Sequence, residues 1–338
     1  MSKDVNINLG GGKADRLPIK HFQFNMFVSD PAIVMVAKRG SGKSICVRAI
    51  LDYFKDIPVG LIIAPTDRMN CFYGKWFPDS YIFYTYKSEI IEKVLARQRI
   101  IIDKNKKRIK ENIEREKQGK KLRKMIDTRS FVVMDDCLGQ KGSWVRDPSI
   151  QEMLFNGRHY KIMYILTMQF PLGITPELRS NFDYVFLLAE DYISNLKRIY
   201  DHYAGMFPSF DSFRQVFSQL TSDYGSMVIV NRGVRKTLFE KIFYYKAPIF
   251  DDESGIDTNM GCKQFQKFHK KNYNEEWATK QNLFNADEYL MRKKKNKSLV
   301  IVDKIKPEEE ERDPKKKYNT NPDLKNFEKK SNYKKKDY

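Results

Sequence analysis

The chain has 338 residues, 41% of them hydrophobic, which is enough to form the core of one large domain with or without additions. It has no run of 18 apolar residues and no apolar signal-peptide core at its polar N-terminus, so we expect neither a membrane span nor secretion. It has only four histidines, and its cysteines are scattered, so we expect no zinc site and reduced thiols in a cytosol-like compartment. The net charge of +19 favours a polyanionic partner such as nucleic acid, although a surplus of lysine that serves only solubility gives the same value.

A phosphate-binding loop is predicted after residues 1–21, which we expect to be flexible. "AIVMV" (32–36) is short, apolar and β-branched, as a buried strand is, and "KSICVRAILDYF" (43–54) has apolar residues at helical spacing. The intervening "AKRGSGKS" therefore joins a strand to a helix, which is the context that a phosphate loop requires. "GGGK" (10–13) has no strand before it, so we do not assign it this role.

Backbone N–H groups and the positive end of the helix would converge on phosphate oxygens in this loop. Lys43 would reach the β- and γ-phosphates of a nucleotide, and the Ser44 hydroxyl would hold Mg²⁺. Ala37 stands where the usual pattern begins with Gly, and a basic turn that only happens to contain two glycines is the alternative. The predicted phosphate-binding residues are Gly40, Ser41, Gly42, Lys43 and Ser44.

A strand and a long charged segment follow the loop. "VGLIIAPT" (59–66) predicts the strand, and residues 87–129 hold 16 Lys and Arg against 7 Asp and Glu. We expect one or two amphipathic helices in this insertion, broken near Gly119 and projecting from the sheet. Such a basic arm could contact DNA phosphates or a neighbouring subunit, or it could be only a solvated insertion.

Two carboxylates end the next apolar strand, in "SFVVMDDCLG" (130–139). Ligands of open α/β sheets lie at the carboxyl ends of the strands. Asp135 is therefore predicted to hold Mg²⁺, directly or through water, and Asp136 to orient or deprotonate an attacking water. An acidic strand end that caps a helix is the alternative.

The strand after that, "KIMYILTMQF" (161–170), ends in the polar residues Thr167 and Gln169. This order indicates the branch of phosphate-loop enzymes with an additional strand between the two motif strands. Gln169 would then sense the γ-phosphate and position water, or it would only satisfy loop amides at a strand end. The predicted fold is α/β, a P-loop NTPase with a mostly parallel central sheet flanked by helices.

The remainder of the core domain, which we place at 22–250, consists of helices and a hairpin. Residues 191–222 are predicted helical, and residues 225–247 are predicted to form two strands joined at "NRG".

A polar, lysine-rich extension is expected over 251–338. From about residue 291 it holds 17 Lys and Arg against 9 Asp and Glu with few apolar residues, which predicts disorder. Its lysine runs could bind DNA, act as a nuclear address or only be solvated, and "LVIV" (299–302) could dock on a capsid protein.

Several of these segments together resemble one family. "AKRGSGKS", "FVVMDDC", "FNGRHYKIMYILTMQF", "PELRSNFDYVFLL" and the hairpin "YGSMVIVNRGVRKTLFEKIFYYKAP" are similar to the genome-packaging ATPases of large double-stranded DNA viruses, in the FtsK–HerA group. The resemblance covers roughly residues 22 to 250. It implies a homo-oligomeric ring, a hexamer or pentamer, that hydrolyses ATP to ADP and phosphate and drives double-stranded DNA into a preformed capsid. It further implies a capsid vertex protein as a partner, and a place in the cytoplasmic factory or nucleus of the host cell, or in the virion.

A ring motor of this family implies an arginine that is donated across the subunit interface. Arg158, in "GRHY", matches the family's arginine before the Gln-ending strand, and Arg179, in "ELRSNFD", is the second candidate. Either could instead pair with a carboxylate and hold a loop.

Two other functions stay open at this point. A helicase or another nucleic-acid-dependent ring ATPase would have the same motifs, and so would a scaffold that binds ATP in order to assemble but turns over little. No nuclease signature follows the core, which disfavours a motor with its own cutting activity. No base-reading module is recognisable, so we expect binding of DNA irrespective of sequence.

Overall fold

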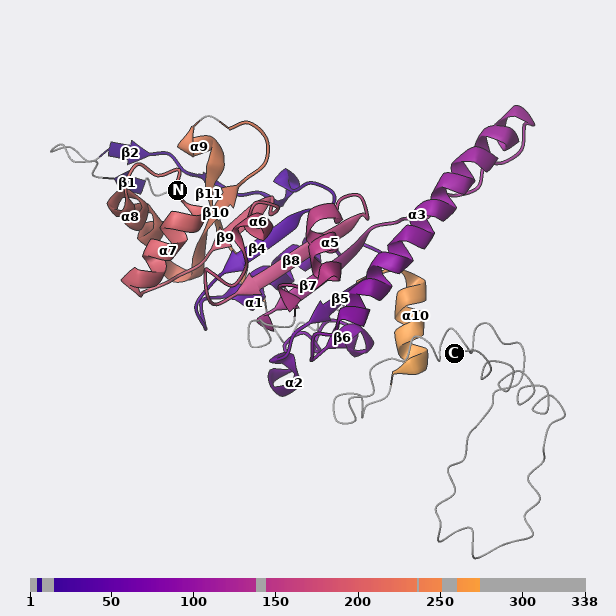
Figure 1. Ribbon diagram of the computed structural model, residues 1–338, viewed down its shortest axis with the longest axis horizontal. Helices are drawn as coiled ribbons and strands as arrows, with labels where there is room; N and C mark the ends of the chain where they lie inside the picture. The colour runs from indigo at the N-terminus through magenta and orange to yellow at the C-terminus, as the bar shows by residue number, and fades with distance from the viewer. Residues whose placement is uncertain (1–4, 8–14, 138–143, 236, 251–259, 274–338) are drawn as a thin grey trace, which may run out of the picture. The chain divides into compact units, whose positions relative to one another are not determined.

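The fold is a mostly parallel β-sheet with helices on both faces (Figure 1). The computed structural model describes residues 5–7, 15–137, 144–235, 237–250 and 260–273. The strands are β1 (Val5–Ile7), β2 (Asp15–Leu17), β3 (Lys20–His21), β4 (Ala32–Val36), β5 (Gly60–Ile63), β6 (Ile82–Phe83), β7 (Ser130–Asp135), β8 (Ile162–Met168), β9 (Tyr184–Leu187), β10 (Gly225–Val230) and β11 (Ile242–Lys246). The α-helices are α1 (Lys43–Tyr53), α2 (Asp67–Asn70), α3 (Ser88–Lys117), α5 (Pro148–Asn156), α6 (Pro176–Arg179), α7 (Ile193–Tyr203), α8 (Phe210–Leu220), α9 (Leu238–Lys241) and α10 (Lys263–Asn272).

The strand order confirms the predicted fold class. Within the described residues, nine strands form one sheet in the order β3-β11-β10-β9-β4-β8-β7-β5-β6, and β1 and β2 form a separate antiparallel pair. The strands from β9 through β4, β8, β7 and β5 to β6 are parallel, and β10 is antiparallel to both of its neighbours. Strand β8 lies between β4 and β7, as expected of the branch with an additional strand.

The central strands are buried on both faces, which explains why they read as continuous apolar runs. Val34 and Val36 of β4 pack into a cluster with residues of α3, α5, α7 and α8. Ile33 and Met35 point the other way, into a cluster that includes residues of α1 and α10. Because side chains alternate along a strand, β4 packs against the helices on both faces of the sheet.

The predicted helices and hairpin near the end of the core domain are confirmed, with one difference. Helices α7 and α8 fill most of 191–222, and β10 pairs with β11 as a hairpin. The connection between the two strands is longer than "NRG" because it includes α9.

The basic insertion differs from the expectation, because only one helix forms in it. Helix α3 is continuous over 30 residues and ends just before Gly119, whose φ of 66° turns the chain back. Residues 120–129 then run in irregular, extended form along the helix. The first turns of α3 bury Ile90, Ile91 and Leu95 against the sheet, whereas residues from 100 onward project from it (Figure 1). We call residues 100–129 the basic arm.

Side chains on α3 hold the returning chain in register. Asn105 exchanges a pair of hydrogen bonds with the backbone of Ile126 (2.7 and 3.0 Å), and Asn112 does the same with Arg123 (2.9 and 2.8 Å). The two asparagines are seven helical residues apart, a rise of about 10.5 Å, and their partners are three extended residues apart, a span of about 10 Å, so the two distances match. Two arginines of α3 have the same spacing: Arg108 donates to the backbone carbonyl of Lys124, and Arg115 donates to that of Lys121.

The ends of the packed region also differ from the expectation. Strand β3 joins the sheet beside β11, so residues 1–21 are not irregular throughout. The boundary at residue 250 is too early, because α10 packs on the domain through buried Phe265, which stacks on Tyr81 at 3.8 Å between ring centroids. The predictions for "GGGK" and for the lysine-rich tail, including "LVIV", lie outside the described residues. Among the helices of the described part, none has both the length and the apolar character to cross a membrane.

Candidate active site

The phosphate loop connects β4 to α1 at the carboxyl edge of the sheet, as predicted. Gly40 and Gly42 have φ of 76° and 90°, a backbone conformation that side chains disfavour, so glycine is needed at both positions. Ser41 is buried and its hydroxyl donates to the carbonyl of Lys38 (2.7 Å), which closes the turn. Gly42 is the N-cap of α1, so the free N–H groups of an 11-residue helix face the loop.

Lys43 and Asp135 meet at this edge although they come from different motifs. Lys43 Nζ lies 3.3 Å from Asp135 Oδ1, and their side chains are 12% and 5% exposed. Ser44 follows Lys43 at the start of α1. The loop and the acidic strand therefore reach the same point, which is what a site for a nucleotide and a divalent cation needs.

Thr167 contacts both residues of the acidic pair. Its hydroxyl donates to Asp135 Oδ1 and accepts from the backbone N–H of Asp136 (3.1 Å). The Gln169 amide donates to Asp136 Oδ2. Asp136 has a φ of 53°, so the chain turns sharply as it leaves β7. The structure thus brings Asp135, Asp136 and Gln169 together beside the phosphate loop.

Tyr73 also belongs to this site, although its sequence context did not single it out. Its hydroxyl donates to Asp135 Oδ2 (2.9 Å). Burial, and then the negative charge of Asp135, raise the pKa of Tyr73 well above its ordinary value, so the phenol stays a donor. The buried carboxylate of Asp67 accepts from the N–H groups of Tyr73 (2.8 Å) and Gly74 (3.3 Å) and holds this turn in place. The only signal for Tyr73 was its position shortly after a strand that ends at the same edge.

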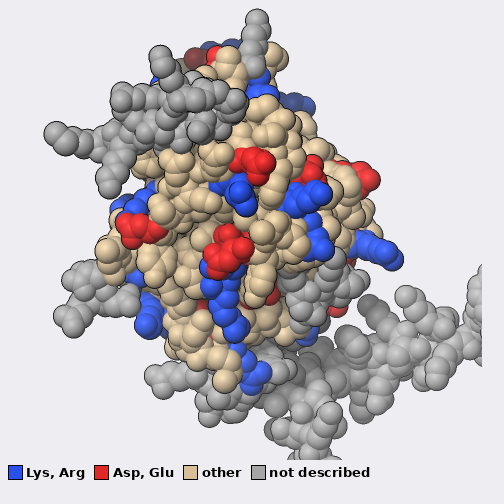
Figure 2. Space-filling view, turned by 90° about the vertical axis from the view of Figure 1, so that its left-hand side faces the viewer, with Lys and Arg blue, Asp and Glu red and all other residues tan. Residues whose placement is uncertain are grey.

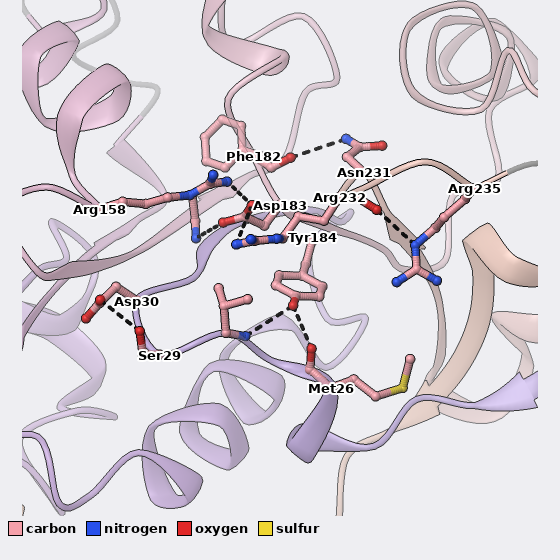
Figure 3. A network of polar contacts seen from close by, with 12 residues as sticks. Met26, Ser29, Asp30, Arg158, Phe182, Asp183, Tyr184, Asn231, Arg232 and Arg235 are labelled. Carbon is pink, nitrogen blue, oxygen red and sulfur yellow. Dashed lines mark hydrogen bonds and ion pairs between the residues drawn. The ribbon is translucent and has the colours of Figure 1, made fainter.

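Arg158 lies away from this edge, in a separate network (Figure 3). It precedes β8, whose seven residues span about 23 Å before Gln169. Its guanidinium pairs with Asp183, whose side chain is fully buried, while the Arg158 side chain is 54% exposed. Asp183 also accepts from the N–H of Ala32 (3.0 Å) and lies 3.8 Å from Arg232. Arg158 therefore cannot reach the phosphate loop of its own chain.

Arg179, the second candidate, is held inside the domain. It lies at the end of α6, is 9% exposed, and donates to the carbonyl of Ile174 (3.2 Å). Its guanidinium also lies 3.4 Å from the His202 ring and over the ring of Tyr203. Neither arginine joins the cluster around Lys43 within one chain.

Comparisons with known proteins give viral relatives. No protein-family model matches the sequence. Uncharacterized protein L437 of Acanthamoeba polyphaga mimivirus is 43% identical over 290 residues, which are 85% of this chain and 96% of that protein. Uncharacterized protein 075L of Invertebrate iridescent virus 6 is 34% identical over 254 residues, 74% of this chain and 89% of that protein. Among solved structures, the genome packaging NTPase B204 of Sulfolobus turreted icosahedral virus 2 is 15% identical with a TM-score of 0.43, over 66% of this chain and 99% of that one.

Proposed function

The chain belongs to the family of viral proteins that includes protein L437 of Acanthamoeba polyphaga mimivirus and protein 075L of Invertebrate iridescent virus 6, and from that premise we propose that it is an ATP-driven motor that moves double-stranded viral DNA into a capsid. The observation that carries the proposal is the meeting of Lys43, Asp135, Asp136 and Gln169 at one edge of the sheet. A carboxylate beside a γ-phosphate sensor serves hydrolysis by water, because it can orient or deprotonate that water.

The donor atoms fit a nucleotide with a magnesium ion. Magnesium takes oxygen ligands, and the Ser44 hydroxyl at the start of α1 and the Asp135 carboxylate at the end of β7 would supply two of them. Bound Mg²⁺ would offset the negative charge of the β- and γ-phosphates. Tyr73 and Thr167 orient the Asp135 carboxylate, and Gln169 orients that of Asp136. Lys43 supplies the positive charge for the transferring phosphoryl group.

A ring of subunits would complete the site in this proposal. Arg158 is about the length of one strand away from its own phosphate loop, so a catalytic role requires that it act on a neighbour. Buried Asp183 holds its guanidinium while half of the side chain stays exposed, which leaves it available at an interface. Arg179 is held by contacts within its own chain.

Mixing two inactive variants tests this role of Arg158. Lys43→Ala subunits keep a good arginine, and Arg158→Ala subunits keep a good pocket, so an interface between them combines the two and we expect activity to recover in mixed rings. Arg179→Ala should give no recovery. The measurement is the ATPase rate of mixtures that light scattering shows to co-assemble. No recovery with either arginine variant, in co-assembled mixtures that remain folded, would remove the claim of an arginine acting across subunits.

DNA would lie along the basic arm in this proposal. The arm holds 12 Lys and Arg against 5 Asp and Glu. Lys104, Lys107 and Lys110 are exposed at every third position of α3. By contrast, Figure 2 shows lysines and arginines side by side with acidic residues on the face at the left of Figure 1. The hydrogen bonds between α3 and the returning chain fix the backbone that carries these lysines. Contacts of lysine with DNA phosphates do not depend on the DNA sequence.

Neutralising these three lysines should weaken DNA binding without changing the basal ATPase rate. For Lys104→Gln/Lys107→Gln/Lys110→Gln, we expect the slope of log affinity against log salt to fall by about 0.9 for each DNA phosphate that the variant no longer neutralises. The control is Lys20→Gln/Lys197→Gln/Lys267→Gln, with the same change in charge on exposed lysines outside the arm. Fluorescence anisotropy with labelled duplex DNA measures both. Equal weakening of DNA binding in the two variants would contradict a role specific to the arm.

The ATPase rate of the wild type with and without long duplex DNA tests the proposal as a whole. We expect stimulation by duplex DNA. A scaffold would show little turnover with or without DNA, and a helicase would in addition unwind a forked substrate. A capsid vertex protein as the docking partner, and action in the factory or nucleus of the infected cell, belong to the same proposal.

A further inference from the structure

The γ-phosphate end of the site determines where the other end of a nucleotide must lie. Asp135, Asp136 and Gln169 all belong to β7 and β8 or follow them directly, on one side of β4. A nucleoside triphosphate is a linear ligand, and its phosphates run across the loop after β4. Its ribose and base must therefore leave on the opposite side, toward β9 and β10.

Tyr224 is an aromatic side chain that lies beside the phosphate loop on that side. It immediately precedes β10, and because β10 is antiparallel to β9, the start of β10 lies at the same edge as the loop. A Cβ placed on Gly42 would lie 3.7 Å from Cδ1 of Tyr224 and 3.8 Å from its Cβ. The tyrosine is nevertheless 65% exposed. An aromatic ring that lies beside the loop and is mostly open to solvent can offer a face to a ligand.

The turn that carries Tyr224 is built in a costly conformation and held by its neighbours. Asp223 and Tyr224 have φ of 51° and 59°, which non-glycine residues adopt rarely. The carboxylate of Asp223 pairs with Lys246 of β11. Gly225 is needed next, because a Cβ there would lie 2.2 Å from the carbonyl oxygen of Leu220. Backbone conformations of this kind persist where the surrounding structure imposes them, and they are frequent at ligand sites.

We propose that Tyr224 forms the base subsite, by stacking on the base of the bound nucleoside triphosphate. The inference rests on the nucleotide site of the proposed function. Stacking uses the face of the ring, which every base offers, so the subsite should accept purine nucleotides with little discrimination between them. The phenol hydroxyl has no part in the stacking.

Binding of ATP and of inorganic tripolyphosphate by calorimetry tests the subsite, because tripolyphosphate has no base. Tyr224→Ala should lower the affinity for ATP about tenfold and leave that for tripolyphosphate unchanged. Tyr224→Phe should bind ATP within about twofold of wild type, since it keeps the ring face. The matched control is Tyr192→Ala, which removes a similarly exposed tyrosine near the same edge and should change neither affinity.

The results that would overturn the subsite differ from those that would overturn the nucleotide site. Tyr224→Ala that binds ATP as wild type does, or whose affinity for tripolyphosphate falls as much as that for ATP, contradicts the stacking role. A fall of ATP affinity in Tyr192→Ala but not in Tyr224→Ala would assign the base to the other tyrosine. A wild-type protein that binds neither ATP nor tripolyphosphate would instead refute the proposed function.

Discussion

We expect Lys43→Ala to abolish nucleotide turnover while the fold persists. The Lys43 ammonium lies 3.3 Å from Asp135 at the start of α1, where the phosphates of a nucleotide would meet the helix. Its charge stabilises most when negative charge shifts in the transition state, and the rate falls tenfold for every ~1.4 kcal/mol of that stabilisation that is removed. Asp135 keeps its hydrogen bonds from Tyr73 and Thr167, so the truncation leaves that carboxylate with partners.

The measurement is the steady-state ATPase rate together with thermal unfolding followed by circular dichroism. Lys55→Ala is the control, because Lys55 follows the same helix but is exposed and pairs with Asp52 rather than with the site. It should retain the wild-type rate. A Lys43→Ala protein that retains more than roughly a tenth of normal hydrolysis would count against the phosphate-loop assignment.

Asp136→Asn should separate binding from hydrolysis. Asparagine has the shape of aspartate and tolerates the left-handed φ of 53° at this position, so the turn after β7 should persist. Lys43, Ser44 and Asp135 remain, and ATP should bind as in wild type. Turnover should fall by about two to four orders of magnitude, because an amide cannot take a proton from water.

Single-turnover hydrolysis and equilibrium binding of ATP distinguish the two carboxylates. Asp135→Asn is the companion variant, and we expect it to weaken binding in the presence of Mg²⁺ as well as turnover. If Asp136→Asn hydrolyses ATP normally and Asp135→Asn does not, the roles of the pair have to be exchanged. Rescue of ATP binding in Asp135→Asn by omission of Mg²⁺ would support its assignment as the metal ligand.

Much of the fold was predictable because its signals are local. The strand, loop and helix around Lys43 lie within consecutive residues, and glycine at positions 40 and 42 is required by φ values that the loop itself imposes. The place of β8 between β4 and β7 followed from polar residues at the end of an apolar strand. Parallel strands bring their carboxyl ends to one edge, so Asp135, Asp136 and Gln169 could be expected together.

In the basic arm, the sequence pattern led to a wrong prediction of secondary structure. Residues 120–129 have a composition that also suits a helix, and we expected up to two helices in this insertion. The returning chain is extended because Asn105 and Asn112, on the other side of the turn, satisfy its backbone groups. Hydrogen bonds between segments that are distant in sequence leave no trace in the periodicity of either segment.

The sequence by itself determined the branch of P-loop fold, the phosphate loop and the acidic pair, since each is a short motif whose backbone conformation and chemistry depend on neighbouring residues. Only the tertiary structure decided that Tyr73 donates to Asp135, that Tyr224 lies beside Gly42, and that Arg158 pairs with buried Asp183 at the far edge. These contacts join residues from different strands and loops. Their geometry depends on the order of strands in the sheet and on where each strand ends, which no single segment encodes.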